Sequence, residues 1–489
     1  MKKILKITSL LLLLISIVSC DDYLDVNDSV DDPILENVDP NRLFVGAQTL
    51  TAENYADELN RVGNWMGVAW SGNYNAFNDA YGDESRYLLS STFYDEVWDN
   101  MYRFASNFAA IERYNDGKNW NNQKAAAKIS RAFYMQYIVD LYGNVPFTEA
   151  FKGGENLFNK YDDAEAIYKD LISLTDEAIQ LIDNGANSED FGNFDIVFGG
   201  DMPRWKQFAQ TLKLRLLTRL VLKAENDGGD LLTYVNTKFA ELSSAQFISQ
   251  DVSVNPGYAN ADDIQNPFWE RYGFNVAGVP TGQGRQTGPS QFAFDLLTNS
   301  NDNRLNRLWR PNIISGHFTA TQQNGTGNAA SIGVGVLKGA DARLPIMLAA
   351  ESYFLQAEAI ERGYLTGNAK ALFDQGVNAS FNTLGASDAA TYISNNDSNI
   401  DLGYNGGDAL RAIITQKWIA LTSISGAELW IEYNRTGFPA NLPLPSGSTD
   451  SNIPVRLLYP ASEYSGNSSN VINQSRSDGF SSKIFWDVN

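Results

Sequence analysis

Residues 123–147, QKAAAKISRAFYMQYIVDLYGNVPF, carry the pattern that decides the fold class. Apolar side chains recur there every three or four residues, which places them on one face of an α-helix. They are Ala126, Ile129, Phe133, Tyr137 and Leu141. Gly143 and Pro146 then supply a C-cap and a stop. The segment therefore predicts a helix over 123–142.

The same periodicity predicts further helices on both sides of this segment. Nearby in the chain they cover 94–115, 162–183 and a stretch that opens at Asp201 and Pro203. Later in the chain they cover 342–362, 369–385 and about 408–434. Between about 225 and 340 the helical pattern weakens, and Gly, Asn, Thr and Pro accumulate.

The segments 342–362 and 369–385 together have the length of a tetratricopeptide-like hairpin, about 34 residues. We therefore expect a mainly α fold, a tetratricopeptide-like α-solenoid scaffold with long irregular loop insertions. No Pro-rich or Gly/Ser-rich linker divides the chain, so we expect residues 42–489 to form a single body. Its helical scaffold is expected at about 42–225 and 342–434, and its loop-rich, ligand-facing part at about 226–341 and 435–489.

The first residues have the features of an export signal: basic side chains and then a short apolar run, at Lys2, Lys3, Lys6 and Leu10–Val18. The run ends in Val-Ser-Cys20, the pattern that a bacterial lipoprotein peptidase cleaves before a lipid-modified cysteine. Cys20 is the only cysteine, so no disulfide can form within the chain. We expect a signal peptide over 1–19 and a lipidated acidic tether over 20–41. The alternative is an ordinary signal peptide that contains a cysteine.

The charge balance argues against nucleic acid as a partner. The chain has 58 acidic and 37 basic side chains, a formal net charge of −21, and phosphate backbones would be repelled. Aromatic residues make up 12% of the chain, and many lie among Asn, Gly and Ser. Such loops suit stacking against sugars or peptides. The competing interpretation is that these aromatics anchor the core and the loops.

Seven short motifs follow one another along nearly the whole chain. They are CDDYLDV (20–26), IVDLYGNVPF (138–147), YDDAEAIY (161–168), WKQFAQTLKLR (205–215), Pro345–Gly363 with Ala357-Glu358-Ala359, Glu428–Pro439 ending in NRTGFP, and RLLYP (456–460). In this order they resemble the SusD/RagB family of outer-membrane lipoproteins of Bacteroidetes.

This resemblance implies a tetratricopeptide-like scaffold that packs on a TonB-dependent transporter of the SusC type and acts as a hinged lid. A nutrient, usually a glycan, is captured and handed to the transporter. Asp21 and Asp22 behind Cys20 resemble a surface-export signal, which implies an address at the cell surface, on the outer membrane.

A site for a neutral sugar needs flat apolar faces together with amide and acid groups. Two segments offer both, 64–87 and 266–275, and Trp309-Arg310 is a lesser third. The candidate ligand residues are Trp70, Tyr74, Tyr81, Trp269, Arg271, Tyr272 and Trp309. For each of them, packing is the competing interpretation.

We expect no catalytic residue, no metal and no cofactor. Glu351 and Glu358 lie two turns apart on one predicted helix, and structural pairing with arginines such as Arg215 and Arg219 is favoured over acid-base chemistry. His317, the only histidine, is interpreted as an exposed loop residue. The Gly-rich and acidic stretches lack the spacing of dinucleotide or calcium sites; they are 282–288, Asp162-Asp163 and Asp262-Asp263.

The sequence thus favours a surface lipoprotein that binds a nutrient without altering it. Two alternatives stay open: a lipid-anchored glycoside hydrolase, whose paired carboxylates sequence cannot locate, and a solenoid scaffold that only assembles partner proteins.

Overall fold

The computed structural model describes residues 38–72, 81–152, 156–312, 318–320, 329–445, 447–448 and 450–489. Cys20, the export signal, most of the tether, Tyr74 and His317 lie outside these ranges. Residues Pro40–Asn489 form one compact unit, and the description below concerns that unit.

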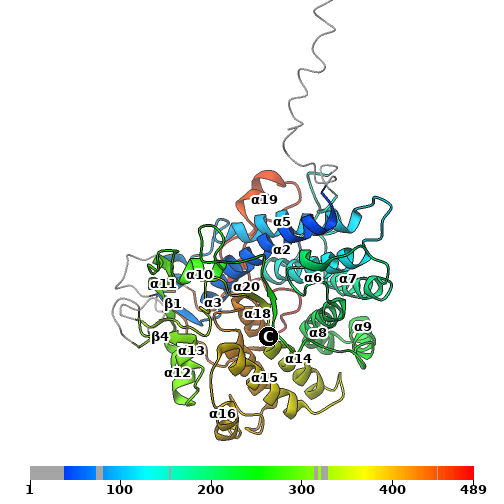
Figure 1. Cartoon of the computed structure of the whole chain (residues 1–489). Helices are drawn as coiled ribbons and strands as arrows, with labels where there is room; N and C mark the ends of the chain where they lie inside the picture. The colour runs from blue at the N-terminus through cyan, green and yellow to red at the C-terminus, as the bar shows by residue number, and fades with distance from the viewer. Residues whose placement is uncertain are drawn as a thin grey trace, which may run out of the picture. The chain divides into compact units, whose positions relative to one another are not determined.

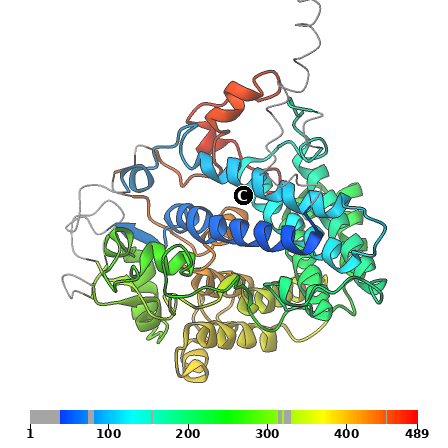
Figure 2. The same ribbon diagram turned by 45° about the horizontal axis from the view of Figure 1, so that its top comes forward.

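Long helices pack side by side in chain order, as in a tetratricopeptide-like scaffold (Figure 1). The first group comprises α2 (Pro40–Asn54), α5 (Asp95–Arg113), α6 (Asn121–Tyr142), α7 (Ala164–Asp183), α8 (Met202–Asp227) and α9 (Gly229–Ala240). Helix α2 lies along α5 (Figure 2), α6 packs between α5 and α7, and α8 packs between α7 and α9. The helices predicted at 94–115, 123–142, 162–183 and from Asp201 onward are confirmed, and α9 was not foreseen.

The second group comprises α14 (Ala349–Glu361), α15 (Ala369–Leu384), α16 (Ala389–Asn396), α17 (Ala409–Leu421) and α18 (Gly426–Thr436). Helix α14 packs on α15, α17 and α8, and it thereby joins the two groups. The helix predicted from 342 begins only at Ala349, because β6 (Leu344–Met347) pairs with the antiparallel strand β2 (Val252–Val254). The mainly α, tetratricopeptide-like fold is confirmed.

The single helix predicted over about 408–434 is wrong. The chain breaks between α17 and α18, where Ser423 takes a left-handed backbone with φ of 66°. Two side chains of α3 (Asn60–Met66) hold the break: Asn60 Nδ2 donates to the Ser423 carbonyl at 3.0 Å, and the Ser423 N–H donates to Asn64 Oδ1 at 2.8 Å. The helix therefore ends because of a contact with residues far away in the sequence.

The remaining elements are short and lie mostly on one flank of the helices (Figures 1 and 2). Tyr55–Leu59 continues α2 as a π-helical turn into α3. The flank comprises β1 (Trp70–Gly72), α4 (Gly82–Arg86), α10 (Pro267–Tyr272), α11 (Gly282–Gln286), β3 (Thr287–Pro289), α12 (Gln291–Asn299), α13 (Leu305–Leu308), β4 (Trp309–Arg310) and β5 (Ser331–Ile332). Strand β1 pairs with β3, and β4 with β5, both antiparallel. Near the C-terminus follow α19 (Ala461–Gly466) and α20 (Asp478–Ser481).

A network of fully buried charges ties the helices together. Arg215 of α8 pairs with Glu351 of α14 through two hydrogen bonds of 2.7 and 2.8 Å. Arg219, one turn later, pairs with Glu428 at 2.7 and 2.8 Å and also contacts Glu432. Other members are Asp140, Glu358, Lys417 and Arg435. Each charge faces a partner of opposite sign, which a buried ion needs in order to stay ionised.

Glu351 and Glu358 are therefore structural, as predicted, although only one partner was foreseen correctly. Glu351 does pair with Arg215. Glu358 pairs with Arg435 through two bonds of 2.8 Å. Arg219 pairs instead with Glu428 of α18. Neither carboxylate is accessible to a substrate, since both are 0% exposed.

The network makes the stability of the protein depend on pH. Burial alone would raise the pKa of Glu432, but its cationic neighbours hold that pKa well below the ordinary 4.5. A lowered folded-state pKa contributes stability above pH 4.5, and this stability is lost as the pH falls through the folded value. Burial raises the pKa of Glu351 and Asp140, which offsets part of the loss.

We expect urea denaturation between pH 7 and 3 to show decreasing stability below about pH 4.5, with a flatter profile in Glu432→Gln. An equally steep profile in that variant would contradict the assignment.

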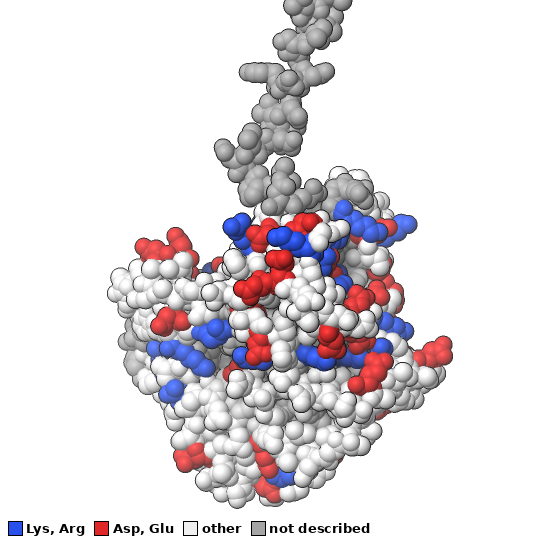
Figure 3. Space-filling model, turned by 45° about the vertical axis from the view of Figure 1, so that its right-hand side comes forward, with Lys and Arg blue, Asp and Glu red and all other residues white. Residues whose placement is uncertain are grey.

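Among the residues that the structure describes, none of the helices has the length and apolar character needed to cross a membrane. On the face drawn in Figure 3, Lys and Arg side chains are interspersed with Asp and Glu and form no continuous basic band.

Candidate functional site

A hollow of about 780 Å³ opens beside α10, and we call it the Trp269 hollow. Its walls are formed by Tyr258–Asn260, Trp269, Phe274–Gly278, Ala340 and Asp341. The volume falls within the range of small-ligand pockets, about 300 to 1,000 Å³. It is large enough for several sugar rings.

Two aromatic rings form the apolar part of the hollow. The rings of Trp269 and Phe274 lie 5.4 Å apart between centroids, tilted by 43°. Helix α10 positions Trp269, because Asn266 caps it by accepting the Trp269 N–H at 3.0 Å and Pro267 starts its first turn. Gly273 allows the chain to turn between the rings, since a Cβ there would lie 2.7 Å from the Trp269 carbonyl oxygen.

Polar groups complete the walls. Asn260 and Asn275 are both exposed, and their amide oxygens accept hydrogen bonds from the chain, from Gln265 at 2.8 Å and from the Val279 N–H at 2.9 Å. Each of these amides also carries an NH₂ group that can donate to a ligand hydroxyl. Asp341 adds a carboxylate acceptor. Flat apolar faces next to amide and acid groups are the combination that sugar binding requires.

Three of the predicted ligand residues lie in the core. Trp70, Tyr272 and Trp309 are 0% exposed. Trp70 donates to Ser423 Oγ at 2.8 Å, and its ring meets the edge of Tyr272 at 5.1 Å between centroids. The structure thus gives these three residues packing roles and no surface on which a ligand could stack.

Tyr81 and Arg271 border a second pocket, of about 540 Å³, which we call the Arg61 pocket. Tyr81 is nearly buried, and its hydroxyl shares a hydrogen bond of 2.8 Å with Thr287. Arg271 lies 3.3 Å from Asp57, and Arg61 donates to Glu58 at 2.6 and 2.7 Å. The cations of this pocket are already paired with carboxylates, so it is less suited to a ligand than the Trp269 hollow.

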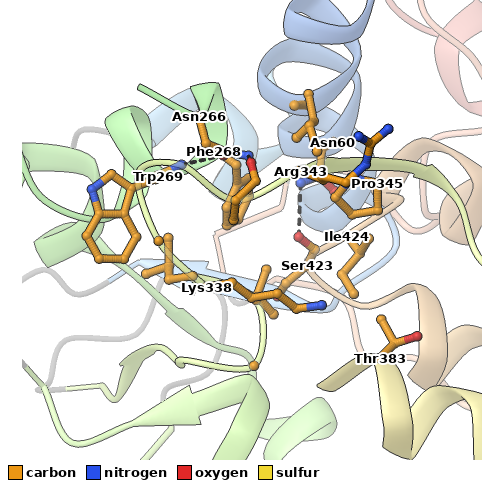
Figure 4. A pocket seen from close by; sticks show the side chains of 17 residues that line it. Asn60, Asn266, Phe268, Trp269, Lys338, Arg343, Pro345, Thr383, Ser423 and Ile424 are labelled. Carbon is orange, nitrogen blue, oxygen red and sulfur yellow. Dashed lines mark hydrogen bonds between the residues drawn. The ribbon is translucent and has the colours of Figure 1, made fainter. Parts of the chain in front are cut away.

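A third cavity extends inward from α10 toward Ser423 and Thr383 (Figure 4). Trp269 and Phe268 close one end of it. Its volume is about 30 Å³, which holds one or two water molecules and no sugar. Of the predicted ligand residues that the structure describes, Trp269 alone therefore lines the Trp269 hollow, and its role in ligand binding stays a prediction. Tyr74 lies outside the described residues.

Sequence reasoning missed Tyr258, Asn260 and Asp341 as parts of the site. Tyr258 lies in the turn-rich stretch NPGYANADD (255–263), a polar aromatic setting of the kind that marks the other candidate segments. Asp341 comes about 70 residues after Trp269 in the chain, and nothing local in the sequence points to it. The segment 266–275 contains a short helix, which the Asn-Pro start could have indicated.

Comparison with known proteins agrees with this architecture. Residues 34–460 match the model of a SusD-like family described as "Starch-binding associating with outer membrane". The chain belongs to the SusD-like family. No curated protein sequence matches it significantly.

Solved structures of SusD-like proteins share the fold. A chitin-binding SusD homologue from Flavobacterium johnsoniae has a TM-score of 0.74 at 21% identity, over 91% of this chain and 97% of that one. A SusD/RagB family protein from Bacteroides thetaiotaomicron has a TM-score of 0.75 at 21% identity, over 92% and 99%. At such identities the likeness concerns the fold.

Membership of the SusD-like family places the chain among non-catalytic glycan-binding proteins that associate with the outer membrane. The glycoside hydrolase alternative is thereby set aside. Within the described residues, no group of three His, Cys, Asp or Glu side chains could hold a metal ion.

Proposed function

We propose that the protein captures a glycan at the cell surface in the Trp269 hollow and passes it to a TonB-dependent transporter of the SusC type. The observation that carries this proposal is the hollow itself, in which Trp269 and Phe274 lie beside Asn260, Asn275 and Asp341. The rings offer apolar faces to the C–H surfaces of sugars, and the polar groups match hydroxyls.

The handover to a transporter and the lipid anchor rest on the family and on the N-terminal motif. The family is described as associating with the outer membrane, and Cys20 follows a signal-like run. An anchor with at least two acyl chains would keep the protein beside a barrel durably. Chitin binding in structural neighbours makes chito-oligosaccharides a sensible first member of any ligand panel.

Replacing Trp269 by Ala should weaken glycan binding by roughly 30-fold or more, because a stacking aromatic is an anchor of the contact. Affinity gels and calorimetry with a panel of starch, chitin and pectic oligosaccharides measure the effect. Phe158→Ala is the matched control, since its ring is 60% exposed and does not line the hollow. Unchanged binding in Trp269→Ala would show that the site lies elsewhere.

The partner is tested separately. We expect the native lipoprotein, solubilised from outer membranes in mild detergent, to co-purify with a TonB-dependent barrel, and Cys20→Ser to release the protein from the membrane fraction. Co-purification with other proteins in the absence of any glycan binding would favour the scaffold alternative instead.

A further inference from the structure

Arg310 does not line the Trp269 hollow itself, but it contacts a residue that does. It is the last residue of β4, and its guanidinium lies over the ring of Phe274, with Cζ 5.1 Å from the ring centroid. Phe274 in turn lines the hollow and packs against Trp269. Arg310 therefore places a positive charge directly behind the aromatic wall of the hollow.

Within the part of the chain that the structure describes, no acidic side chain compensates the charge of Arg310. Its Nε and Nη2 atoms are enclosed without a hydrogen-bond partner, and Nη1 is not among the enclosed atoms. Among the described residues no carboxylate forms an ion pair with it, and burial lowers its pKa. Buried Arg304, by contrast, is held by Asp302 through bonds of 2.6 to 3.1 Å. A half-buried guanidinium without an acceptor is costly, which calls for an explanation.

The sequence that follows Arg310 supplies no acidic residue that could act as its counter-ion. The stretch from Pro311 to Ala340 contains no Asp or Glu. Asp341 lines the hollow, and it supplies an acceptor for hydroxyls and some repulsion of anions. The strongly acidic protein as a whole also repels anions, but at physiological salt this repulsion is screened beyond about 8 Å. We therefore expect the nearby charge of Arg310, rather than the net charge of the protein, to determine whether an anionic ligand binds in the hollow.

We infer that the natural glycan carries an anionic substituent, a carboxylate or a sulfate ester, which pairs with Arg310 while the sugar ring stacks on Trp269 and Phe274. The inference rests on the proposed function and narrows its substrate class from glycans to acidic glycans. Hydrogen bonds from a charged donor to a charged acceptor are among the strong ones in proteins.

The test compares ligands that differ only in charge. Binding of oligogalacturonides is measured by calorimetry against the same oligosaccharides after reduction of their carboxyl groups, and sulfated galactan oligosaccharides are measured against their desulfated forms. We expect at least one acidic member to bind roughly 10- to 100-fold more tightly than its neutral counterpart. The pair that shows the preference identifies carboxylate or sulfate as the group.

Variants locate the effect. Arg310→Gln should abolish the preference for the acidic form, and Arg310→Lys should retain part of it. Lys338→Gln, which removes an exposed cation outside the hollow, should leave it unchanged. Thermal melts establish that each variant is folded.

Equal binding of acidic and neutral forms by the wild type, or a preference that survives in Arg310→Gln, would overturn the inference and leave the proposed function standing. If no member of the panel, neutral or acidic, binds at all, the proposed function itself fails.

Discussion

Replacing Arg219 by Met is expected to lower the free energy of unfolding by about 3 to 5 kcal/mol. The guanidinium is the shared partner of three buried carboxylates: it donates to Glu428 and Glu432, and its Nε lies 3.6 Å from Asp140. Methionine fills much of the volume but removes the positive charge, so Glu428 and Asp140 stay in the interior without their main counter-ion, while Glu432 keeps Arg435 and Lys417. Urea denaturation monitored by tryptophan fluorescence measures the loss.

A matched control lies one turn further along the same helix. Lys223 pairs with Asp227 at 2.6 Å on the surface, and Lys223→Met should cost less than about 0.5 kcal/mol, because exposed pairs contribute little. The double variant Arg219→Met with Glu428→Leu should recover part of the loss, since it removes one of the stranded charges together with its partner. A loss below about 1 kcal/mol in Arg219→Met would mean that the network does not hold the helices together.

Gly426→Ala should destabilise the protein by about 3 kcal/mol, near the upper end for overpacking. Helices α3 and α18 approach each other so closely that a Cβ on Gly426 would lie 2.2 Å from the Asn60 carbonyl oxygen. On the facing helix, a Cβ on Gly63 would lie 2.0 Å from the Gly426 carbonyl carbon. The contacting atoms belong to the backbone, so the helices must move apart, and the break at Ser423 would lose its bonds from Asn60 and Asn64.

The same substitution at Gly46 should have the opposite sign. Gly46 lies exposed in the middle of α2 with no atom within 4 Å of an added Cβ. Alanine there should stabilise the helix by about 0.5 to 1 kcal/mol. Differential scanning calorimetry of both variants measures the two shifts. Similar shifts in both would contradict the close approach of α3 and α18.

The long helices could be predicted because their periodicity is local. Helix α6 begins two residues before the predicted start and ends where predicted, at Tyr142, since its apolar face and Gly143 are both visible in the sequence. The break at Ser423 and the strand at Leu344–Met347 could not be predicted, because their causes lie far away in the chain, in Asn60 and Asn64 and in the strand Val252–Val254. Sequence periodicity does not contain such pairings.

The site was predictable in part for the same reason. The segment 266–275 was singled out by its composition, and it does supply Trp269 and Phe274 to the hollow. Composition could not distinguish the partly exposed Trp269 from the buried Trp70 and Trp309, because burial is decided by elements that pack over a residue from elsewhere in the chain. The unpaired charge of Arg310 became visible only once its neighbours in space were known.

The most direct test of the account is a crystal structure of the protein with the tightest oligosaccharide from the binding panel. We expect a sugar ring against Trp269 and Phe274, with hydroxyls bonded to Asn260, Asn275 or Asp341. An oligosaccharide bound elsewhere, for instance in the Arg61 pocket, with the faces of Trp269 and Phe274 uncovered, would contradict it.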